Sequence, residues 1–114
     1  MTDCLFCKIV NGDIPADIVY QDDDVLAFRD ISPQAPTHML LIPKRHISTP
    51  NDLTEADVMT LGKLHLKASE LAKEAGHGEQ GYRTVMNCNS DGGQTVFHIH
   101  MHLLGGRALS WPPG

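Results

Sequence analysis

The segment "QTVFHIHMHLL", residues 94–104, places His98, His100 and His102 at alternate positions. Side chains of a β-strand point to opposite faces in turn, so the three imidazoles are predicted to share one face, roughly 6 to 7 Å apart. The interleaved residues Phe97, Ile99, Met101 and Leu103 are predicted to share the other face and to meet the core. Imidazole has no strand propensity that would produce this alternation, so the pattern favours a functional role over a polar outer face.

The composition is that of one soluble domain spanning residues 1–114. The chain is 41% apolar and 20% charged, with a net charge of −5 and no basic cluster. This balance argues against a nucleic-acid-binding surface, and the lack of an apolar run of about 18 residues argues against a membrane span. The N-terminal segment lacks the pattern of a secretory leader, and the three cysteines are an odd number. We therefore expect a cytoplasmic protein whose cysteines are free thiols or metal ligands.

Hydrophobic periodicity predicts an α+β domain, in which an antiparallel sheet of about five strands packs against one long helix. The helix is predicted to begin at Thr54, with Asp57 completing a capping pair, and to end at Gly76 or Gly78. The strands are expected in residues 18–20, 25–29, 38–44, 81–89 and 95–105.

The histidine pattern has two functional interpretations, a metal site and a nucleophile with supporting imidazoles. Histidine suits attack on phosphorus because it is nucleophilic near neutral pH and the phospho-imidazole that forms is easily hydrolysed. The stretch "SDGGQT", residues 90–95, directly precedes the histidines. Its glycines let backbone N–H groups approach an anion closely, and Thr95 can donate to a phosphate or a leaving group. This context favours a nucleophile beside a phosphate-binding loop, although a GG turn alone could be a simple connection.

The run from His98 to Leu104 resembles the signature of the histidine triad superfamily, in which histidines alternate with apolar residues. The resemblance extends over residues 4–47, residues 86–106 and the terminal "WPPG", and is closest to the nucleotide-binding (Hint) branch. It implies homodimers with joined sheets that hydrolyse the P–N bond of adenosine or guanosine 5′-phosphoramidates to the nucleoside monophosphate and an amine. A third histidine at position 102, where the transferase branch usually has Gln, favours hydrolysis.

The resemblance also implies roles for the candidate catalytic residues. His100 would be the nucleophile that becomes nucleotidylated, and His102 would contact the phosphate. His38 would be a fourth histidine that supports the nucleophile, with His98 completing the triad. Thr95 would relay a proton to the leaving amine, which cannot depart readily as an anion.

The candidate substrate-binding residues come from the same resemblance. Asp30 would accept hydrogen bonds from both ribose hydroxyls, although an exposed acid at a strand end needs no function. The remaining candidates are Phe6, Phe28 and Ile31 for the purine, Asn87 near the α-phosphate or ribose, Gly93, Gln94 and Thr95 for the phosphoryl oxygens, and Trp111. The apolar members could equally be plain core. Residues 107–114, with Trp111, would belong to the substrate and dimer region, or could be a disordered end.

Cys4 and Cys7 have the spacing of a tetrahedral zinc site, to which His46 could add a third ligand. By the resemblance, His98 would be the fourth ligand. Such a zinc would be structural, since catalysis through a histidine nucleophile requires no cofactor. The alternative is a pair of reduced cysteines that bind nothing.

Two rival functions remain open. One is a nucleotide-binding regulatory protein with residual hydrolase activity, whose output is a protein contact. The other is a metal-dependent enzyme that uses the histidines as ligands, which the phosphate-binding loop disfavours.

Overall fold

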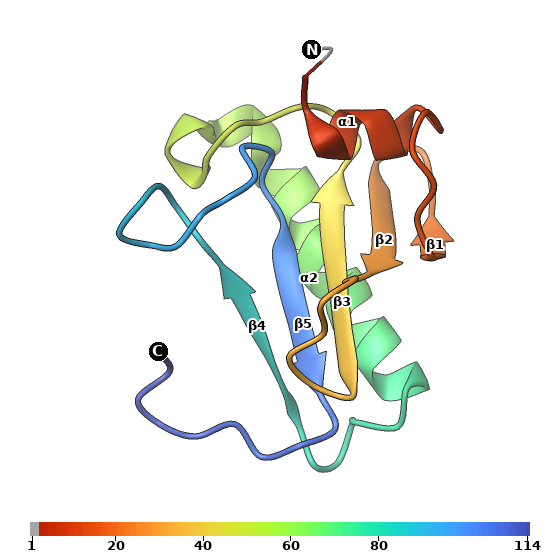
Figure 1. Ribbon diagram of the computed structural model, residues 1–114, viewed down its shortest axis with the longest axis vertical. Helices are drawn as coiled ribbons and strands as arrows, with labels where there is room; N and C mark the ends of the chain where they lie inside the picture. Colours follow the sequence, from red (N-terminus) through yellow and green to blue (C-terminus); the bar gives the residue numbers. More distant parts are fainter. Residues whose placement is uncertain (1–2) are drawn as a thin grey trace.

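The computed structural model describes residues 3–114 and contains one five-stranded sheet with one main helix (Figure 1). Its elements are α1 (Leu5–Val10), β1 (Ile18–Gln21), β2 (Val25–Arg29), β3 (Thr37–Pro43), α2 (Val58–Glu74), β4 (Tyr82–Met86) and β5 (Met101–Gly105), with 3₁₀ turns at Pro50–Asp52 and Glu55–Asp57. The strand order is β1-β2-β3-β5-β4, and every neighbouring pair is antiparallel. This architecture confirms the predicted α+β fold.

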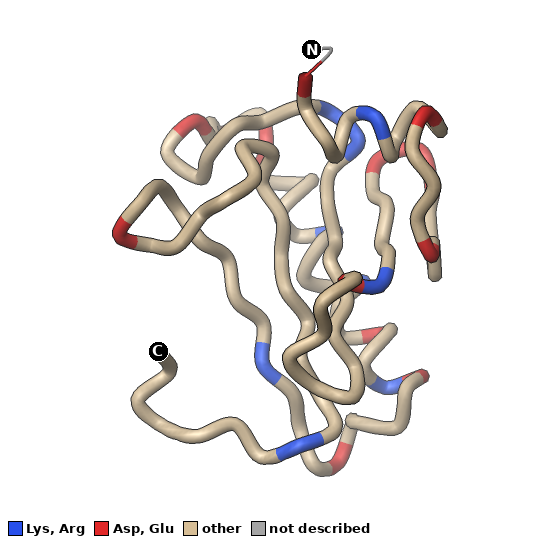
Figure 2. Tube along the Cα trace, viewed as in Figure 1, with Lys and Arg blue, Asp and Glu red and all other residues tan. Residues whose placement is uncertain are grey.

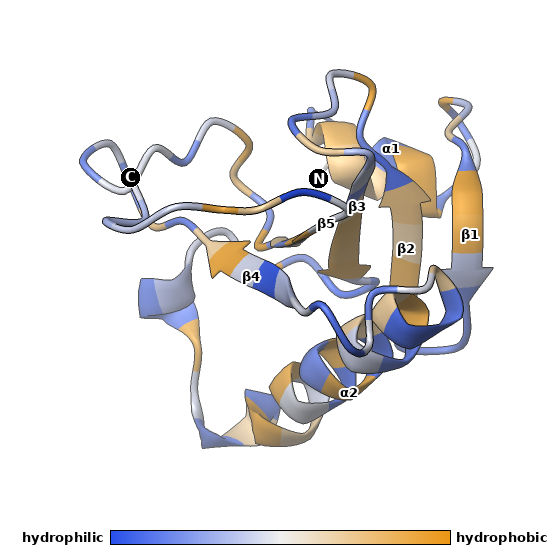
Figure 3. Ribbon diagram, turned by 90° about the horizontal axis from the view of Figure 1, so that it is seen from below, coloured by the Kyte–Doolittle hydropathy of each residue, from blue (hydrophilic) through white to orange (hydrophobic). Residues whose placement is uncertain are grey.

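Side-chain alternation along the strands divides the core between the two faces of the sheet. One cluster packs beneath α2 and includes Val25, Ala27, Met39, Leu41, Met101 and Leu103. The other packs beneath α1 and includes Phe6, Ile9, Leu26, Phe28, Leu40 and Ile42. Figure 3 shows the two helices on opposite sides of the strands. The α1 face therefore also receives the even-numbered residues of β3 and β5, among them His38 and His102.

The register of the two central strands brings these two histidines together. His38 lies opposite Leu104, and Leu40 lies opposite His102, so the imidazoles are diagonal neighbours on one face. β3 and β5 carry no Lys, Arg, Asp or Glu, as Figure 2 shows. The two central strands themselves therefore place no charged side chain beside these imidazoles.

The start of α2 follows the predicted capping pattern. Thr54 accepts a hydrogen bond from the backbone N–H of Ala56, and the Asp57 carboxylate accepts one from the N–H of Thr54 at 2.9 Å. The first turn is 3₁₀, and the α-helix proper begins at Val58. Asp57 is buried and also pairs with Arg45, which joins the helix start to the segment after β3. Gly76, at φ +92°, lies just beyond the C-terminal end of the helix, as the sequence predicts.

The predicted strand over residues 95–105 is wrong in its first half, because β5 begins only at Met101. Both neighbouring ladders end there, with Met101 opposite Leu41 on β3 and Met86 on β4. The preceding residues leave the sheet and bond elsewhere, the N–H of Ile99 to the carbonyl of Ile47 at 2.7 Å. Phe97, predicted to face the core, is 50% exposed. The strand predicted over 81–89 likewise ends early, at Met86.

No helix within residues 3–114 combines the length and apolarity that a membrane span requires.

We expect Asp57→Ala to lower the free energy of unfolding by about 1 to 2 kcal/mol, because the substitution removes a helix cap and a buried partner of Arg45. Urea unfolding measures the change. Asp13→Ala, at an exposed position, is the matched control and should leave the stability unchanged. Equal effects of the two substitutions would contradict the capping role.

Candidate active site

A cavity of about 540 Å³ opens on the α1 face of the sheet, within the size range of small-molecule sites, roughly 300 to 1,000 Å³. It lies between α1, residues 14–17 that follow α1, the end of β2 and residues 95–102, which carry the alternating histidines. Seven of the sequence-predicted residues line it: Phe6, Phe28, Asp30, Ile31, Thr95, His100 and His102. The structure thus gathers residues that lie far apart in the sequence into one hollow with an apolar side and a histidine side.

His100 is held in one orientation and one tautomer. Its Nδ1 lies 2.8 Å from the backbone carbonyl oxygen of His98, and the ring is buried. A carbonyl oxygen only accepts, so Nδ1 carries the proton and Nε2 presents its lone pair. The Phe6 and His100 rings pack in a T-shaped arrangement, with centroids 5.2 Å apart and planes at 89°. This tautomer, assigned from the hydrogen bond, is the one a nucleophilic imidazole needs.

His38 and His102 form a directional pair behind the cavity. The backbone N–H of Gln34 donates to Nδ1 of His38 at 3.0 Å, so the proton of His38 is on Nε2. That Nε2 lies 2.9 Å from Nδ1 of His102 and donates to it. His102 consequently carries its own proton on Nε2 and offers a donor within the cavity that it lines.

The environment keeps these imidazoles neutral. Burial, together with the neighbouring His100 and His38, lowers the pKa of His102 to about 4. Burial also lowers the pKa of His38, partly opposed by Asp30, whose carboxylate lies 3.4 Å from Nε2. The second Asp30 oxygen accepts the N–H of Ser32 at 2.7 Å, which orients the carboxylate at the cavity wall.

The loop of residues 87–95 is held by hydrogen bonds between its own residues. Its Asn87 side chain donates to the carbonyl of Gly92 at 2.6 Å, and Gly93 adopts φ +80°. A Cβ on Gly92 would lie 2.4 Å from the carbonyl oxygen of Cys88, so only glycine fits there. Gln94 is 6% exposed and its side chain bonds within the protein. Of the predicted loop residues, Thr95 lines the cavity, whereas Asn87, Gly93 and Gln94 shape the loop.

Trp111 lies apart from this cavity within the chain. The tail that carries it runs beside β4, on the side of the sheet away from α1 in Figure 1. Arg83 of β4 donates to the carbonyls of Leu109 and Ser110, which holds the tail, and Trp111 is 82% exposed.

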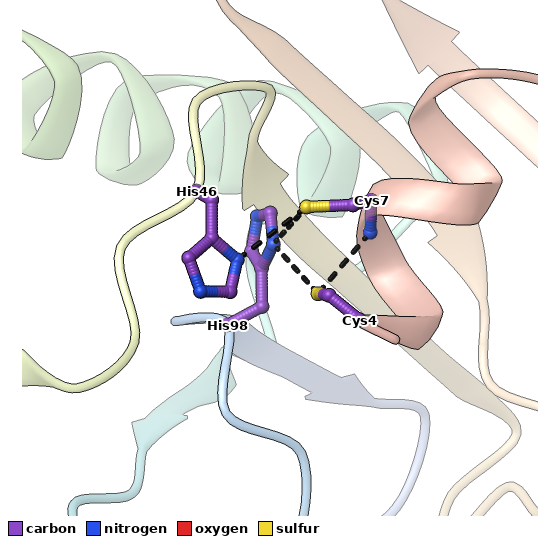
Figure 4. Close-up of side chains that lie close together, drawn as sticks. All are labelled: Cys4, Cys7, His46 and His98. Atoms are coloured by element: carbon purple, nitrogen blue, oxygen red, sulfur yellow. Dashed lines mark hydrogen bonds between the residues drawn. The ribbon is translucent and has the colours of Figure 1, made fainter. Parts of the chain in front are cut away.

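A second group of side chains, the thiol cluster, consists of Cys4, Cys7, His46 and His98 (Figure 4). Nδ1 of His98 lies 3.4 Å from Sγ of Cys4 and 3.6 Å from Sγ of Cys7, and Nδ1 of His46 lies 3.4 Å from Sγ of Cys7. All four predicted ligand atoms lie within 4.8 Å of one another.

The donor set of the thiol cluster fits a tetrahedral zinc ion. Bonds of about 2.3 Å to sulfur and 2.0 Å to nitrogen place sulfur and nitrogen ligands about 3.5 Å apart, close to the observed separations. Nε2 of His98 donates to the carbonyl of Pro43 at 2.7 Å, which leaves the lone pair of Nδ1 facing the thiols. Burial lowers the pKa of His98, so its imidazole is in the neutral form that binds metals.

Sequence reasoning missed α1 and the cavity wall that it supplies. Leu5 and Ile9 of α1 line the cavity with Ile14, Pro15 and Ala16 that follow. The signal was present, because Leu5, Phe6, Ile9 and Val10 recur at helical spacing and Gly12, at φ +82°, follows the last turn. A helix of six residues is too short for that periodicity to stand out.

The comparisons with known proteins agree with this geometry. The profile of the HIT domain matches residues 11–109. A curated relative from Escherichia coli strain K12, named purine nucleoside phosphoramidase, is 56% identical over 105 residues, which cover 92% of this chain and 88% of the relative. The crystal structure of a HIT family hydrolase from Legionella pneumophila has 57% identity and a TM-score of 0.97, covering 98% of this chain and all of that chain (100%).

A zinc-bound histidine triad family protein from Mycobacterium smegmatis is 35% identical, with a TM-score of 0.81 over 93% of this chain and 76% of that chain. With the family profile spanning most of its length and its fold reproduced in solved relatives, this chain belongs to the histidine triad (HIT) family.

Proposed function

We propose that the protein is a hydrolase that cleaves the P–N bond of purine nucleoside 5′-phosphoramidates through a nucleotidyl intermediate on His100. The observation that carries the proposal is the bond from Nδ1–H of His100 to the His98 carbonyl, which presents Nε2 as a nucleophile in a nucleotide-sized cavity. The name of the E. coli relative supports the same reaction.

The cavity offers a complementary surface for each part of such a substrate. The purine would lie against Phe6, Phe28 and Ile31, which line the apolar part. Asp30 would accept hydrogen bonds from the ribose hydroxyls, because a carboxylate has two oxygens for a vicinal diol. The phosphoryl group would then lie at His100 and His102, which line the cavity together with Thr95.

The reaction would proceed in two displacements. Nε2 of His100 attacks phosphorus, a P–N bond to the imidazole forms and the P–N bond to the amine breaks. The amine leaves with a proton supplied through the Thr95 hydroxyl, while Nε2–H of His102 donates to a phosphoryl oxygen. Water then attacks the nucleotidyl-histidine, releases the nucleoside monophosphate and restores the free imidazole.

We also propose that the protein acts as a homodimer. β4 is an edge strand, and an edge strand can extend its sheet by pairing with a second copy. Leu61 and His65 of α2 line a groove with Thr84, Val85 and Met86 of β4, beside this edge. The exposed Trp111 lies on the tail that Arg83 of β4 anchors, so pairing along β4 would carry Trp111 toward the partner's cavity.

We further propose that the thiol cluster binds one structural zinc ion. Two sulfur and two nitrogen donors would complete its coordination, and a closed site of this kind cross-links the chain without taking part in the reaction. The zinc-bound relative from M. smegmatis supports this assignment. When bound, the ion would tie α1 to the segments that carry His46 and His98.

His100→Ala should lower the hydrolysis of an adenosine 5′-phosphoramidate carrying a reporter amine by about 10³-fold or more, because no other group replaces the nucleophile. His77→Gln, which changes a histidine that bonds Thr37, is the matched control and should retain activity. Mass spectrometry of rapidly quenched native protein should show one nucleotidyl group.

The same assay separates the rival functions. Tight AMP binding without amine release would favour a nucleotide-binding regulatory protein. Loss of activity on chelation, with zinc still held in the thiol cluster, would favour a metal-dependent enzyme.

The free energy of unfolding should fall as the pH is lowered from about 6.5 toward 4. In this window the unfolded chain protonates His102, whose ordinary pKa is 6.5, whereas the folded chain does not because its pKa is about 4. The unfolded state binds more protons, so acid favours unfolding. Urea unfolding of the native protein and His102→Gln across this range measures the effect. The variant should lose less stability on acidification than the native protein, and equal losses in the two proteins would contradict this role of His102.

The purified protein should bind one zinc ion per chain, and Cys7→Ser should bind markedly less, because the variant lacks one of two thiolate ligands. Metal analysis after dialysis measures the stoichiometry, and substitution with Co²⁺ should give thiolate-to-metal absorption bands. Cys88→Ser is the control, since Cys88 lies outside the cluster. Equal zinc content in all three proteins would contradict the assignment.

A further inference from the structure

Three consecutive residues, His46, Ile47 and Ser48, connect the thiol cluster, the nucleophile segment and the phosphate-binding loop. We call residues 46–48 the bridge, residues 98–100 the nucleophile segment and residues 87–95 the phosphate loop. The ring of His46 is part of the thiol cluster, with Nδ1 3.4 Å from Sγ of Cys7. Its Nε2 lies 3.2 Å from the hydroxyl of Ser48, so the ring is tied to the far end of the bridge.

The middle of the bridge holds the nucleophile segment. The carbonyl of Ile47 accepts the N–H of Ile99 at 2.7 Å, and Ile99 lies between His98 and His100. Ile47 and Ile99 are buried, so this bond is protected from water. A shift of the bridge would therefore move the backbone that orients the His100 ring.

The end of the bridge holds the phosphate loop through Gln94. Nε2 of Gln94 donates to the carbonyl of Ser48 at 2.8 Å and to that of Val96 at 3.1 Å. Its Oε1 accepts the N–H of Asn89 at 2.9 Å, where the backbone has φ 58°. Gln94 thus joins both ends of the loop to the bridge. Its amide is committed to these bonds, which makes it a positioning residue and not a substrate contact.

We propose that the bridge and Gln94 couple the thiol cluster to the phosphate loop, so that zinc in the cluster tightens nucleotide binding. The inference rests on the proposed nucleotide and zinc sites. Zinc would fix the rings of His46 and His98, which stand at the start of the bridge and of the nucleophile segment. With those two rings fixed, the bonds of Ile47 and Ser48 hold the loop and the nucleophile in one relative position.

Such coupling is reciprocal. If zinc raises the affinity for a nucleotide by some factor, the nucleotide must raise the affinity for zinc by the same factor. Couplings between distinct sites commonly amount to about 5- to 150-fold. Because the link runs through hydrogen bonds of the bridge and Gln94 and not through a ligand that both sites share, we expect the lower end of this range, about 5- to 20-fold.

The test is calorimetric titration of AMP into metal-free and zinc-loaded protein, with zinc affinity measured by chelator competition in the presence and absence of AMP. The native protein should bind AMP about 5- to 20-fold more tightly when loaded, and AMP should tighten zinc binding equally. In Gln94→Met both ratios should fall toward one, while zinc still binds at one per chain. Equal AMP affinity of the two native forms, or an unchanged ratio in Gln94→Met, would overturn the proposal.

Two further variants separate positioning from general destabilisation. Leu71→Val weakens the core under α2, on the opposite face of the sheet, and should keep the native ratio. Ser48→Ala removes the tie to His46 but leaves the carbonyl that Gln94 bonds, and it should reduce the ratio if Gln94→Met fails to fold. An unchanged ratio in Ser48→Ala would also contradict the bridge.

Phosphoramidate hydrolysis by the native protein, measured in parallel, distinguishes this inference from the proposed function. Coupling without hydrolysis would refute the phosphoramidase and leave the bridge intact. Hydrolysis without coupling would refute the bridge alone. Failure of both the metal-free and the zinc-loaded form to bind AMP would refute both proposals.

Discussion

The hydrogen bond from Nδ1 of His100 to the carbonyl of His98 is the constraint on which the chemistry of this site depends. An imidazole has two nitrogens, and which one carries the proton decides which one can attack. The carbonyl oxygen accepts the proton of Nδ1 in a hydrogen bond, so Nε2 is unprotonated and its lone pair is available. The bond spans only two residues of the chain, so the backbone conformation that creates it must itself be held. The tertiary structure supplies that support through Ile47 and through the ring of His98.

Neutrality is the second requirement, and burial provides it. The pKa of His102 is lowered to about 4 by removal from water and by its imidazole neighbours, so the ring donates one hydrogen bond without carrying a full charge. The chain from the N–H of Gln34 through His38 to His102 sets the direction of that donor. A nucleotide brings its own negative charge, and neutral donors can bind it without paying for a buried cation in the free protein.

The two side-chain groups of the molecule share one residue. The ring of His98 belongs to the thiol cluster, and its backbone carbonyl accepts the hydrogen bond from Nδ1 of His100, the proposed nucleophile. Because one residue belongs to both groups, a ligand that fixed the His98 ring in the cluster would also restrict the backbone carbonyl that orients the His100 ring. The bridge of residues 46–48 repeats this arrangement on the other side, since it touches the cluster through a ring and the active site through two carbonyls. The start of α1 contributes to both groups, because the N-cap residue Cys4 and Cys7 belong to the thiol cluster and Phe6 packs against His100.

The local patterns of the sequence determined the sheet, the long helix and its cap, and the placement of His102 on the face of β5 opposite Met101 and Leu103. These features follow from alternation and helical spacing, which act over a few residues. The sequence also contained the zinc-like spacing of Cys4 and Cys7. Only the tertiary structure decided that β5 starts at Met101, that Phe97 is exposed, and that the Gln94 side chain bonds the backbone of Asn89 and Ser48. Those outcomes depend on which backbone groups of β3, β4 and the bridge are close enough to bond, and no periodicity within one segment encodes the position of another.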